Sequence, residues 1–487
     1  MHSWSVGTVK CKTVNQVRVA ALFILHCTLF ITHPPLQAQS KKAVDLYTQG
    51  ITLFNQQKAV EAIPFFEQSL KEAPGFLDAQ VRIGQAYEFT RRPEPALNAY
   101  KAAIALLSNQ PGAATGTAAA AYQGATQILL KMGRYSEAIP MLETFLGYFA
   151  PESAKAKQVQ RLLAIARYGQ LAVQNPVLVI PRLLSESLKV GDSQYFPVLT
   201  ADEQTLVFTM LKPEGDEDLM VASWLPEGGW QTPVPLSANI NTTDNEGTAS
   251  LSADGRLLVF TACQSGRRQG FGSCDLYSTQ KNGDVWSAPQ NLGPAINTRD
   301  YESQPSLSAD GGQLYFVSNR PGGLGQRDIW RSTRDVDGNW TEPINLGKPV
   351  NTPMNEASPF LHANEQALFF ASDGHIGMGG YDLFLSRLRP DSLKSGWSVP
   401  TNLGYPINTS EDQASLFVSA NGIRAYYSFE EQKVGVSQKS RIYTFDLPPV
   451  LREQVRPVNY LKGRITDVRT GKPLLATLDL INLKTNQ

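Results

Sequence analysis

The stretch Ser306–Trp340 reads SLSADGGQLYFVSNRPGGLGQRDIWRSTRDVDGNW and contains most of one repeating unit of this chain. It starts with a short strand at Ser306-Leu307, and after an Ala-Asp-Gly turn Leu314–Val317 alternates as a second strand. Asp328–Arg331 is a third strand beyond a glycine-rich loop, and Asp337-Gly338 predicts a hairpin turn into a fourth. Four short antiparallel strands per repeat are typical of a propeller blade.

The unit recurs five times with a fixed internal spacing. Each copy has a proline, a turn residue 21 positions later and an aromatic residue six positions after that, and the prolines are 52, 56, 54 and 57 residues apart. A period near 50 is typical of propellers and arrays, so the sequence predicts an all-β five-bladed propeller over 177–449. The marker residues are Pro181, Pro233, Pro289, Pro343 and Pro400; Asp202, Asp254, Asp310, Asn364 and Asn421; and Phe208, Phe260, Phe316, Phe370 and Tyr427.

The first of these prolines has no blade before it. Val177–Leu184 is therefore predicted to be a fourth strand without a blade of its own, and Arg441–Leu447 a third strand without a fourth. We expect the N-terminal strand to complete the last blade, because ring closure removes exposed sheet edges. Deleting Val177–Leu184 is then expected to destabilise the whole ring.

Two polar positions also recur in the repeat. An asparagine follows the proline by eight residues and a glutamate follows it by 13. We expect these side chains to bond backbone groups of the long connections between blades; the alternative is a ring of side chains that grips a ligand in the central channel. The residues are Asn241, Asn297, Asn351 and Asn408, then Glu246, Glu302 and Glu356, with Gln194, Gln413 and Lys189 in the remaining places.

Residues 41–172 are predicted to be a helical repeat region, since apolar residues recur there at helical spacing and a second period of 34 appears. Gly50 matches Gly84 and Phe66 matches Tyr100, while a third copy has Thr126 in the glycine position. The region resembles the tetratricopeptide repeat. That resemblance implies a protein-binding groove, and the alternative is a spacer that docks on the next domain. The groove residues implied are Tyr47, Gln85, Gln123 and Gln127.

The two ends of the chain differ from this core. Lys10, Lys12 and Arg18 precede the apolar run Val19–Ile31, and small residues follow, so 1–38 is predicted to be a secretory signal peptide rather than a membrane anchor. At the other end, 458–487 alternates as two strands. It resembles the opening of a carboxypeptidase-regulatory-like β-sandwich, which we expect to be incomplete.

The order of these parts carries a further resemblance. Ser318–Gly325 followed by Asp328-Ile329, and Ser372–His375 followed by Gly379–Leu383, look like the WD40-like propeller repeats of bacterial envelope proteins. Together with the helical repeats, the chain resembles Bacteroidetes-type OmpA-family envelope proteins. The resemblance implies a periplasmic protein of a Gram-negative bacterium, associated with the outer membrane through partners. The OmpA-like domain that grips peptidoglycan is missing from the sequence, so peptidoglycan binding is not expected.

Composition and motifs argue against several function classes. Lys+Arg and Asp+Glu both number 44, so no basic field predicts nucleic-acid binding. After signal cleavage the only histidines are His362 and His375, and no Gly-x-Ser-x-Gly elbow accompanies them. Asp335–Asn339 lacks the acidic twelfth position of a calcium loop and is predicted to be a hairpin turn. We therefore expect no catalytic residues, no metal and no cofactor.

Cys263 and Cys274 are predicted to form a disulfide, because they are an even pair in an exported chain and lie on strands expected to pair. Ligand binding by the propeller is expected at its variable loops, for which Arg267, Arg268, Asn319 and Arg320 are the candidates. The leading hypothesis is a non-enzymatic envelope scaffold that binds other envelope proteins. The alternative is a propeller that senses a peptide or glycan, and a propeller hydrolase is opposed by the missing elbow and hydrolase domain.

Overall fold

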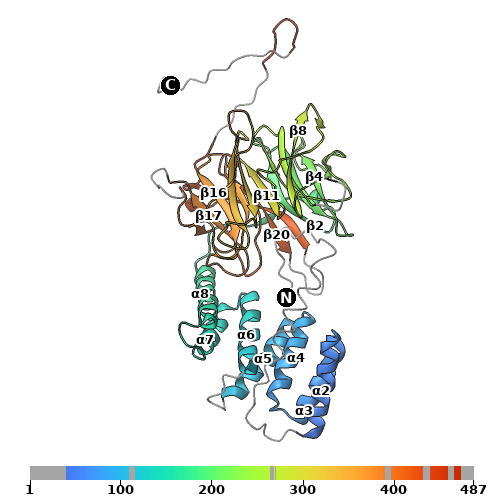
Figure 1. The fold of residues 1–487 in the computed structure, drawn as a ribbon, viewed down its shortest axis with the longest axis vertical. Coiled ribbons are helices and arrows are strands. Elements are labelled where there is room, and N and C mark those ends of the chain that lie inside the picture. Colours follow the sequence, from blue (N-terminus) through green and yellow to red (C-terminus); the bar gives the residue numbers. More distant parts are fainter. Residues whose placement is uncertain are drawn as a thin grey trace.

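A computed structural model describes residues 40–108, 116–263, 268, 270–389, 396–431, 439–458 and 465–472. The protein is an α + β multidomain chain, with a stack of helices followed by an all-β ring, as the sequence predicts (Figure 1). The predicted signal peptide at 1–38 lies outside the described residues, and so does most of the predicted β-sandwich at 458–487.

The helices before the ring form what we call the helical module. Ser40 and Ser153 cap its first and last helices, since their hydroxyls accept hydrogen bonds from Ala43 N (3.2 Å) and Ala156 N (3.1 Å). The helices are α2 (Lys41–Asn55), α3 (Ala59–Glu72), α4 (Leu77–Phe89), α5 (Pro93–Ser108), α6 (Gly116–Lys131), α7 (Tyr135–Leu146) and α8 (Ala154–Gln174).

The repeated glycines of the helical module allow its helices to approach closely. A Cβ on Gly50 would lie 2.6 Å from the ring of Phe66, and one on Gly84 would lie 2.7 Å from the ring of Tyr100. In the third repeat Thr126 replaces the glycine, and the smaller Leu142 stands where the aromatic residue would be. Both residues are fully buried. The larger residue on the first helix and the smaller residue on the second therefore fill about the same space as the glycine and aromatic pair of the other repeats.

The ring consists of five antiparallel sheets, which we number as blades 1 to 5 in chain order. In blades 1 to 4 the strand that comes first in the chain lies at the inner edge of the sheet, and a two-residue strand lies at the outer edge. Blade 1 has β2 (Ser193–Leu199), β3 (Thr205–Leu211), β4 (Glu217–Ser223) and β5 (Val234–Pro235); blade 2 has β6 (Asn245–Leu251), β7 (Leu257–Cys263), β8 (Cys274–Asn282), β9 (Val285–Trp286) and β10 (Gln290–Asn291). Blade 3 has β11 (Glu302–Leu307), β12 (Gln313–Ser318), β13 (Asp328–Thr333) and β14 (Ile344–Asn345); blade 4 has β15 (Glu356–Leu361), β16 (Ala367–Ser372), β17 (Asp382–Arg387) and β18 (Thr401–Asn402).

Blade 5 confirms the predicted closure of the ring. Its sheet order is β1-β21-β20-β19, and its outermost strand β1 (Arg182–Leu183) comes from the N-terminal end of the propeller. Arg182 pairs with Thr444, and Leu183 pairs with Tyr443. The other strands are β19 (Leu416–Val418), β20 (Arg424–Glu431) and β21 (Lys439–Asp446), and the short helix α9 (Pro449–Arg452) follows them.

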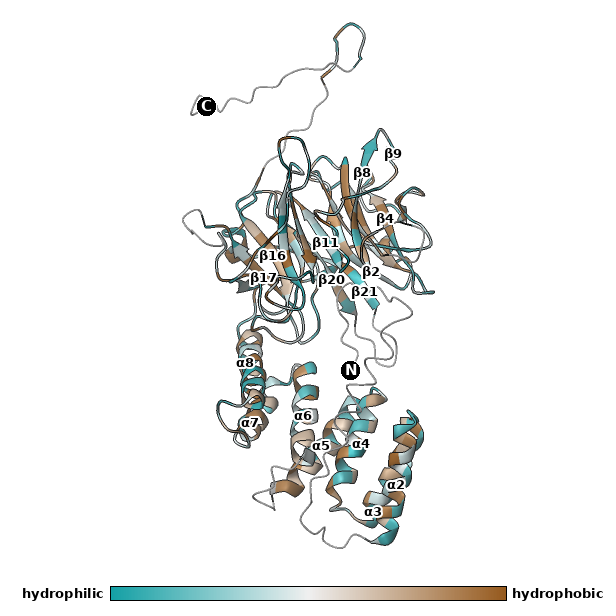
Figure 2. Cartoon of the chain, viewed as in Figure 1, coloured by the Kyte–Doolittle hydropathy of each residue, from teal (hydrophilic) through white to brown (hydrophobic). Residues whose placement is uncertain are grey.

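The five repeated aromatic residues are buried in the ring core. Phe208, Phe260, Phe316, Phe370 and Tyr427 all have a relative exposure of 0%. Figure 2 shows that the strands of the ring carry much of its apolar sequence, together with some polar segments. The aromatic residue that recurs in the sequence is therefore one buried core side chain in each blade.

Candidate binding surfaces

The predicted groove residues of the helical module lie on alternate helices, with Tyr47 on α2, Gln85 on α4, and Gln123 and Gln127 on α6, and all four are half-buried. Tyr47 is partly structural, because its ring packs 4.9 Å from that of Phe76.

Hydrogen bonds form along this polar face, within α4 and between alternate helices. Arg82 Nη1 donates to Gln85 Oε1 (3.0 Å), and Lys155 Nζ on α8 donates to Gln123 Oε1 (3.1 Å). Thr117 Oγ1 donates to Asp78 Oδ1 (2.7 Å), which connects α6 to α4. Amide groups and two cations on one continuous face can bind the backbone and acidic side chains of a peptide. We call Arg82, Gln85, Gln123, Gln127 and Lys155 the inner polar face.

The helical module also docks on the propeller, through α7 and α8 (Figure 1). Tyr135 Oη donates to the carbonyl of Met378 (2.7 Å), and Met378 is 1% exposed within the helical core. Arg161 donates to the carbonyls of Gly374 (2.8 Å) and Asp373 (2.5 Å) in the β16–β17 loop. Gly169 allows the contact, since a Cβ there would lie 2.5 Å from the ring of Tyr135. The helical module therefore contacts the propeller through Tyr135 and Arg161, neither of which belongs to the inner polar face.

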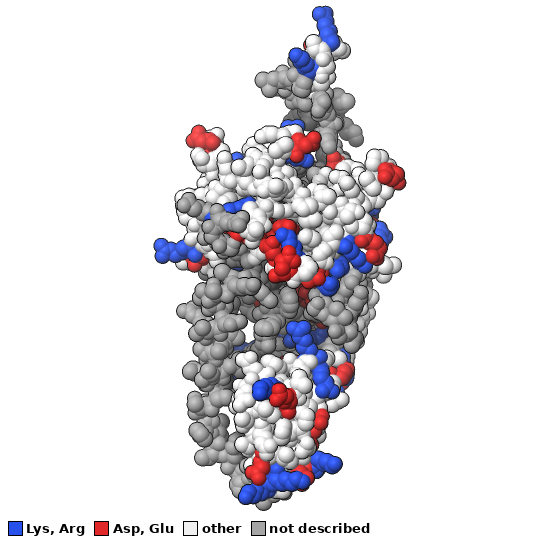
Figure 3. Space-filling view, turned by 90° about the vertical axis from the view of Figure 1, so that its right-hand side faces the viewer, with Lys and Arg blue, Asp and Glu red and all other residues white. Residues whose placement is uncertain are grey.

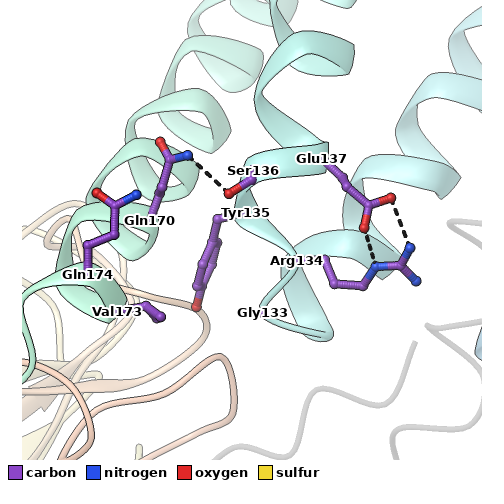
Figure 4. A pocket seen from close by; sticks show the side chains of 8 residues that line it. All are labelled: Gly133, Arg134, Tyr135, Ser136, Glu137, Gln170, Val173 and Gln174. Atoms are coloured by element: carbon purple, nitrogen blue, oxygen red, sulfur yellow. Dashed lines mark hydrogen bonds and ion pairs between the residues drawn. The ribbon is translucent and has the colours of Figure 1, made fainter.

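A shallow pocket lies beside this contact, between the start of α7 and the end of α8 (Figure 4). Its charged side chains already pair with each other, since Arg134 Nε lies 2.6 Å from Glu137 Oε1. Hydrogen bonds from Arg134 and Lys101 hold the pKa of Glu137 down at about 2. Gln170 Nε2 likewise donates to Ser136 Oγ (3.0 Å). Few of its polar groups remain for a ligand.

The repeated asparagines of the propeller are structural, as predicted. Asn351 Oδ1 accepts from Ile329 N (3.0 Å), and its Nδ2 donates to Ile329 O (3.0 Å) and to Asn345 Oδ1 (2.9 Å). Asn345 Nδ2 in turn donates to Asp328 Oδ2 (2.9 Å), which also accepts from Leu324 N in the glycine-rich loop. Blade 2 repeats the network with Asn297, Asn291 and Asp275. Blade 4 repeats the asparagine part with Asn408 and Asn402, and Asp382 accepts from Met378 N, but Asn402 Nδ2 makes no bond to Asp382.

The repeated glutamates are structural too, and two of them pair with the predicted loop residues Arg268 and Arg320. Glu302 accepts from Thr298 N and Thr298 Oγ1 and lies 3.3 Å from Arg320 Nη2. In blade 2, Glu246 lies 3.5 Å from Arg268 Nη2, and burial raises the pKa of that carboxyl to about 7.

The structure therefore corrects the expectation that Arg268 and Arg320 face a ligand. Their side chains are 14% and 9% exposed, and each also donates to a backbone carbonyl, of Ile240 and Ile296 respectively. Asn319 is exposed, but its Oδ1 accepts from Tyr301 N (3.0 Å). Arg267 lies outside the described residues.

Both histidines of blade 4 take over structural positions of the repeat. His375 Nε2 bonds the carbonyl of Val350 (2.9 Å), as Arg320 bonds that of Ile296 in blade 3. His362 is fully buried, and its Nε2 bonds the carbonyl of Ser419 in blade 5 (3.0 Å). Burial lowers the pKa of both imidazoles.

Cys263 and Cys274 form a disulfide, and they face each other in the register of β7 and β8. Among the described residues, no group of three or more His, Cys, Asp or Glu is placed to hold a metal ion. No helix in the described part of the chain is both long and apolar enough to span a membrane. The face in Figure 3 carries basic and acidic side chains next to each other rather than a field of one sign.

Sequence reasoning missed a pocket between blades 5 and 1, which includes Trp224, Glu203 and Arg182. The available signal was a departure from the repeat. Glu203 stands at a turn position that is glycine in three other blades, at Gly255, Gly311 and Gly422.

No protein-family model matches this chain, and no curated protein matches it. Among solved structures, TolB from Acinetobacter baumannii is similar at 15% identity, over 60% of this chain and 70% of that one, with a TM-score of 0.34. A putative TolB from Agrobacterium tumefaciens is similar at 13% identity, over 55% and 84%, with a TM-score of 0.35. The first TPR of Spaghetti (RPAP3) bound to an HSP90 peptide is similar at 20% identity, over 28% and 100%, with a TM-score of 0.22. At these scores the likeness adds nothing to what the helices and strands themselves show.

Proposed function

We propose that this protein is a non-enzymatic scaffold that binds other proteins of the cell envelope. The inner polar face of the helical module takes the partner, and the propeller holds that module in a fixed position. The periplasmic location rests on the N-terminal sequence, and the place in an outer-membrane-associated or secretion-linked assembly rests on the resemblance in domain order.

One observation carries the proposal: Gln127 on the inner polar face has an open side-chain amide, whereas the recurring polar side chains of the propeller repeat are already bonded. The Gln127 side chain is half-buried and has no hydrogen-bond partner within the described ranges. By contrast, Arg268 and Arg320, with the repeated asparagines and glutamates, are already bonded inside the ring. A partner that approaches the inner polar face therefore finds an open amide at Gln127, beside the Arg82–Gln85 and Lys155–Gln123 hydrogen bonds.

The non-enzymatic part of the proposal is supported by the state of the ionisable groups in blade 4. His362 and His375 each bond a backbone carbonyl, and their lowered pKa values keep them neutral near pH 7. Groups engaged in this way hold the fold and are poorly placed to transfer protons to a substrate.

The test is cross-linking in the native envelope with a triple variant of the inner polar face, Arg82→Ala with Gln85→Ala and Gln127→Ala. The matched control is Gln68→Ala with Lys71→Ala, on the exposed surface of the outer helix α3. We expect partners captured by the wild-type protein to be lost at least about tenfold with the triple variant and retained with the control. Equal recovery from all three proteins would refute the proposed binding face.

A further inference from the structure

A pocket of roughly 450 Å³ lies where the two ends of the ring meet, between blades 5 and 1. This volume falls within the range of about 300–1,000 Å³ typical of small-molecule sites. We propose that this pocket, which we call the closure pocket, binds an uncharged saccharide on the indole ring of Trp224. Its lining residues include Arg182, Glu203, Gln204, Trp224, Arg424 and Tyr426.

The first support is the identity of Trp224, which differs from its counterparts in blades 2 to 4. In blade 3, Arg334 pairs with Trp340 and its guanidinium covers that ring at 4.7 Å from the centroid. In blade 2, Lys281 Nζ lies 5.8 Å from the ring of Trp286 in the same arrangement. Blade 4 has Leu388 opposite Trp397, and blade 1 has a second tryptophan, Trp224, opposite Trp230.

This substitution exposes an aromatic surface. Trp224 meets Trp230 edge-on, with ring centroids 5.4 Å apart and an interplanar angle of 83°. Trp230 is 6% exposed, whereas Trp224 is 42% exposed and faces the pocket. Trp230 thus supports the edge of Trp224, and part of Trp224 remains open for stacking.

The second support is the backbone at Glu203, which is left-handed at φ 54°. Blades 2, 3 and 5 have glycine here, and a residue with a Cβ is strained in this conformation. The Glu203 carboxylate accepts a hydrogen bond from Tyr426 Oη of blade 5 (2.5 Å), so it joins the two blades at the closure pocket. Glu365 of blade 4 shares the conformation, and it accepts from Gln313 of blade 3 (3.0 Å). Only at blade 1 does the strained carboxylate stand beside an open aromatic ring.

The charges of the closure pocket select the ligand class. Arg182 and Arg424 are exposed cations on blade 5, and Asp202 and Glu203 are acidic groups on blade 1. The signs balance, so neither an anion nor a cation is favoured as a whole. A pyranose ring suits the site, because its C–H face stacks on indole while its hydroxyls bond guanidinium, amide and carboxylate groups.

The position of the closure pocket gives binding a structural consequence. Arg182 belongs to the strand that closes the ring, while Tyr426 and Trp224 belong to the last and first blades. A saccharide that contacts all three binds the closed ring in preference to an opened one. It should therefore raise the unfolding temperature of the propeller.

The test measures binding of cellohexaose, chitohexaose, maltohexaose and xylohexaose to the full-length protein by calorimetry and tryptophan fluorescence. The key variant is Trp224→Lys, which installs the residue that blade 2 already uses and so preserves the fold. The matched control is Val234→Lys, which adds the same charge to the same blade at a residue that is 50% exposed and outside the pocket.

We expect at least one oligosaccharide to bind with a Kd of about 1 mM or tighter and to raise the unfolding temperature. Trp224→Lys should weaken that binding at least about tenfold, with Val234→Lys unchanged. The proposal is overturned if no oligosaccharide of the panel binds, or if binding survives Trp224→Lys. It is also overturned if a mixed-sequence peptide library, but no saccharide, binds in a manner that depends on Trp224.

Discussion

At the scale of single residues, the chain uses the same position for different chemistry from blade to blade. The position 13 residues after the repeat proline is glutamine in blades 1 and 5 and glutamate in blades 2 to 4. Gln413 accepts from Thr409 N (2.9 Å) and donates to Thr409 Oγ1 (2.8 Å). Glu356 accepts from Thr352 N and Thr352 Oγ1, both at 2.8 Å. Glutamine therefore makes the same two bonds to threonine, and Glu356 Oε1 also accepts from Ser372 Oγ (2.8 Å).

Glu356 gives the propeller a pH-dependent stability. It is fully buried, and burial raises the pKa of its carboxyl to about 7. A raised carboxyl pKa stabilises the fold below the unfolded pKa, and that contribution is lost as pH rises from about 4.5 through about 7.

Glu356→Gln should remove this loss. We expect the variant to exceed the wild type in unfolding free energy at pH 8 by about 1–3 kcal/mol, with a smaller difference at pH 5. Denaturant unfolding at the two pH values measures this. A variant with the same pH dependence as the wild type would contradict the assignment to Glu356.

At the scale of elements, the innermost strands are linked by a repeated bulge. Phe196, Thr248, Gln304 and Ser358 have φ values of 53°, 36°, 55° and 49°, and they lie at one position of the repeat. Each N–H donates to a side chain of the preceding blade, as Thr248 N does to Thr209 Oγ1 (3.0 Å). The other bonds are Phe196 N to Ser428 Oγ, Gln304 N to Thr261 Oγ1 and Ser358 N to Gln304 Oε1.

Thr209→Val tests one of these links. The substitution keeps the side-chain shape and leaves Thr248 N–H buried without its partner, which should cost about 1–3 kcal/mol of unfolding free energy. Thr279→Val is the control, because it makes the same replacement of a threonine hydroxyl by a methyl group on another strand of the ring. It removes a donor to Ser287 O but leaves no backbone N–H without its partner. A Thr209→Val protein as stable as wild type would show that the bulge does not link the blades.

The blades and the closing strand could be predicted from the sequence, whereas the bulges and the arginine–glutamate pairs could not. The fixed spacing from Pro181 to Phe208 predicted the blades, and the unmatched Val177–Leu184 predicted the closing strand, because both follow from local pattern. The bulges could not be predicted, since they are set by partners more than 30 residues away, such as Thr209 for Thr248. Arg268 and Arg320 looked like loop residues for the same reason, because their glutamate partners lie on another strand.

At the scale of the whole molecule, the helical module and the propeller meet in a buried contact at blade 4. Arg161→Ala should loosen that contact, because the half-buried guanidinium of Arg161 donates hydrogen bonds to the carbonyls of Gly374 and Asp373. Each hydrogen bond from a charged group contributes about 1.5–3 kcal/mol to the free energy of unfolding. We expect faster proteolysis of the linker 175–181 and two separate unfolding transitions.

The control for this prediction is Arg167→Ala on the same helix. Arg167 is 60% exposed and pairs with Glu143 on the surface (2.8 Å), so its loss should cost between about 0 and 1 kcal/mol. If Arg161→Ala behaves like Arg167→Ala, the two parts are not held together by this contact.

The closing strand β1 completes blade 5 and follows the segment that leads from the helical module into the ring. Leu184 N donates to Ile442 O (3.0 Å) directly after β1, and Leu184→Pro removes that donor. The control is Leu178→Ala, at a linker residue that is 90% exposed. The most direct measurement is amide hydrogen exchange along β20 and β21 in the full-length protein. If β1 closes the ring, Leu184→Pro alone should show faster exchange in both strands and a lower unfolding temperature. Unchanged exchange and unfolding in that variant would contradict closure of the ring by the N-terminal strand.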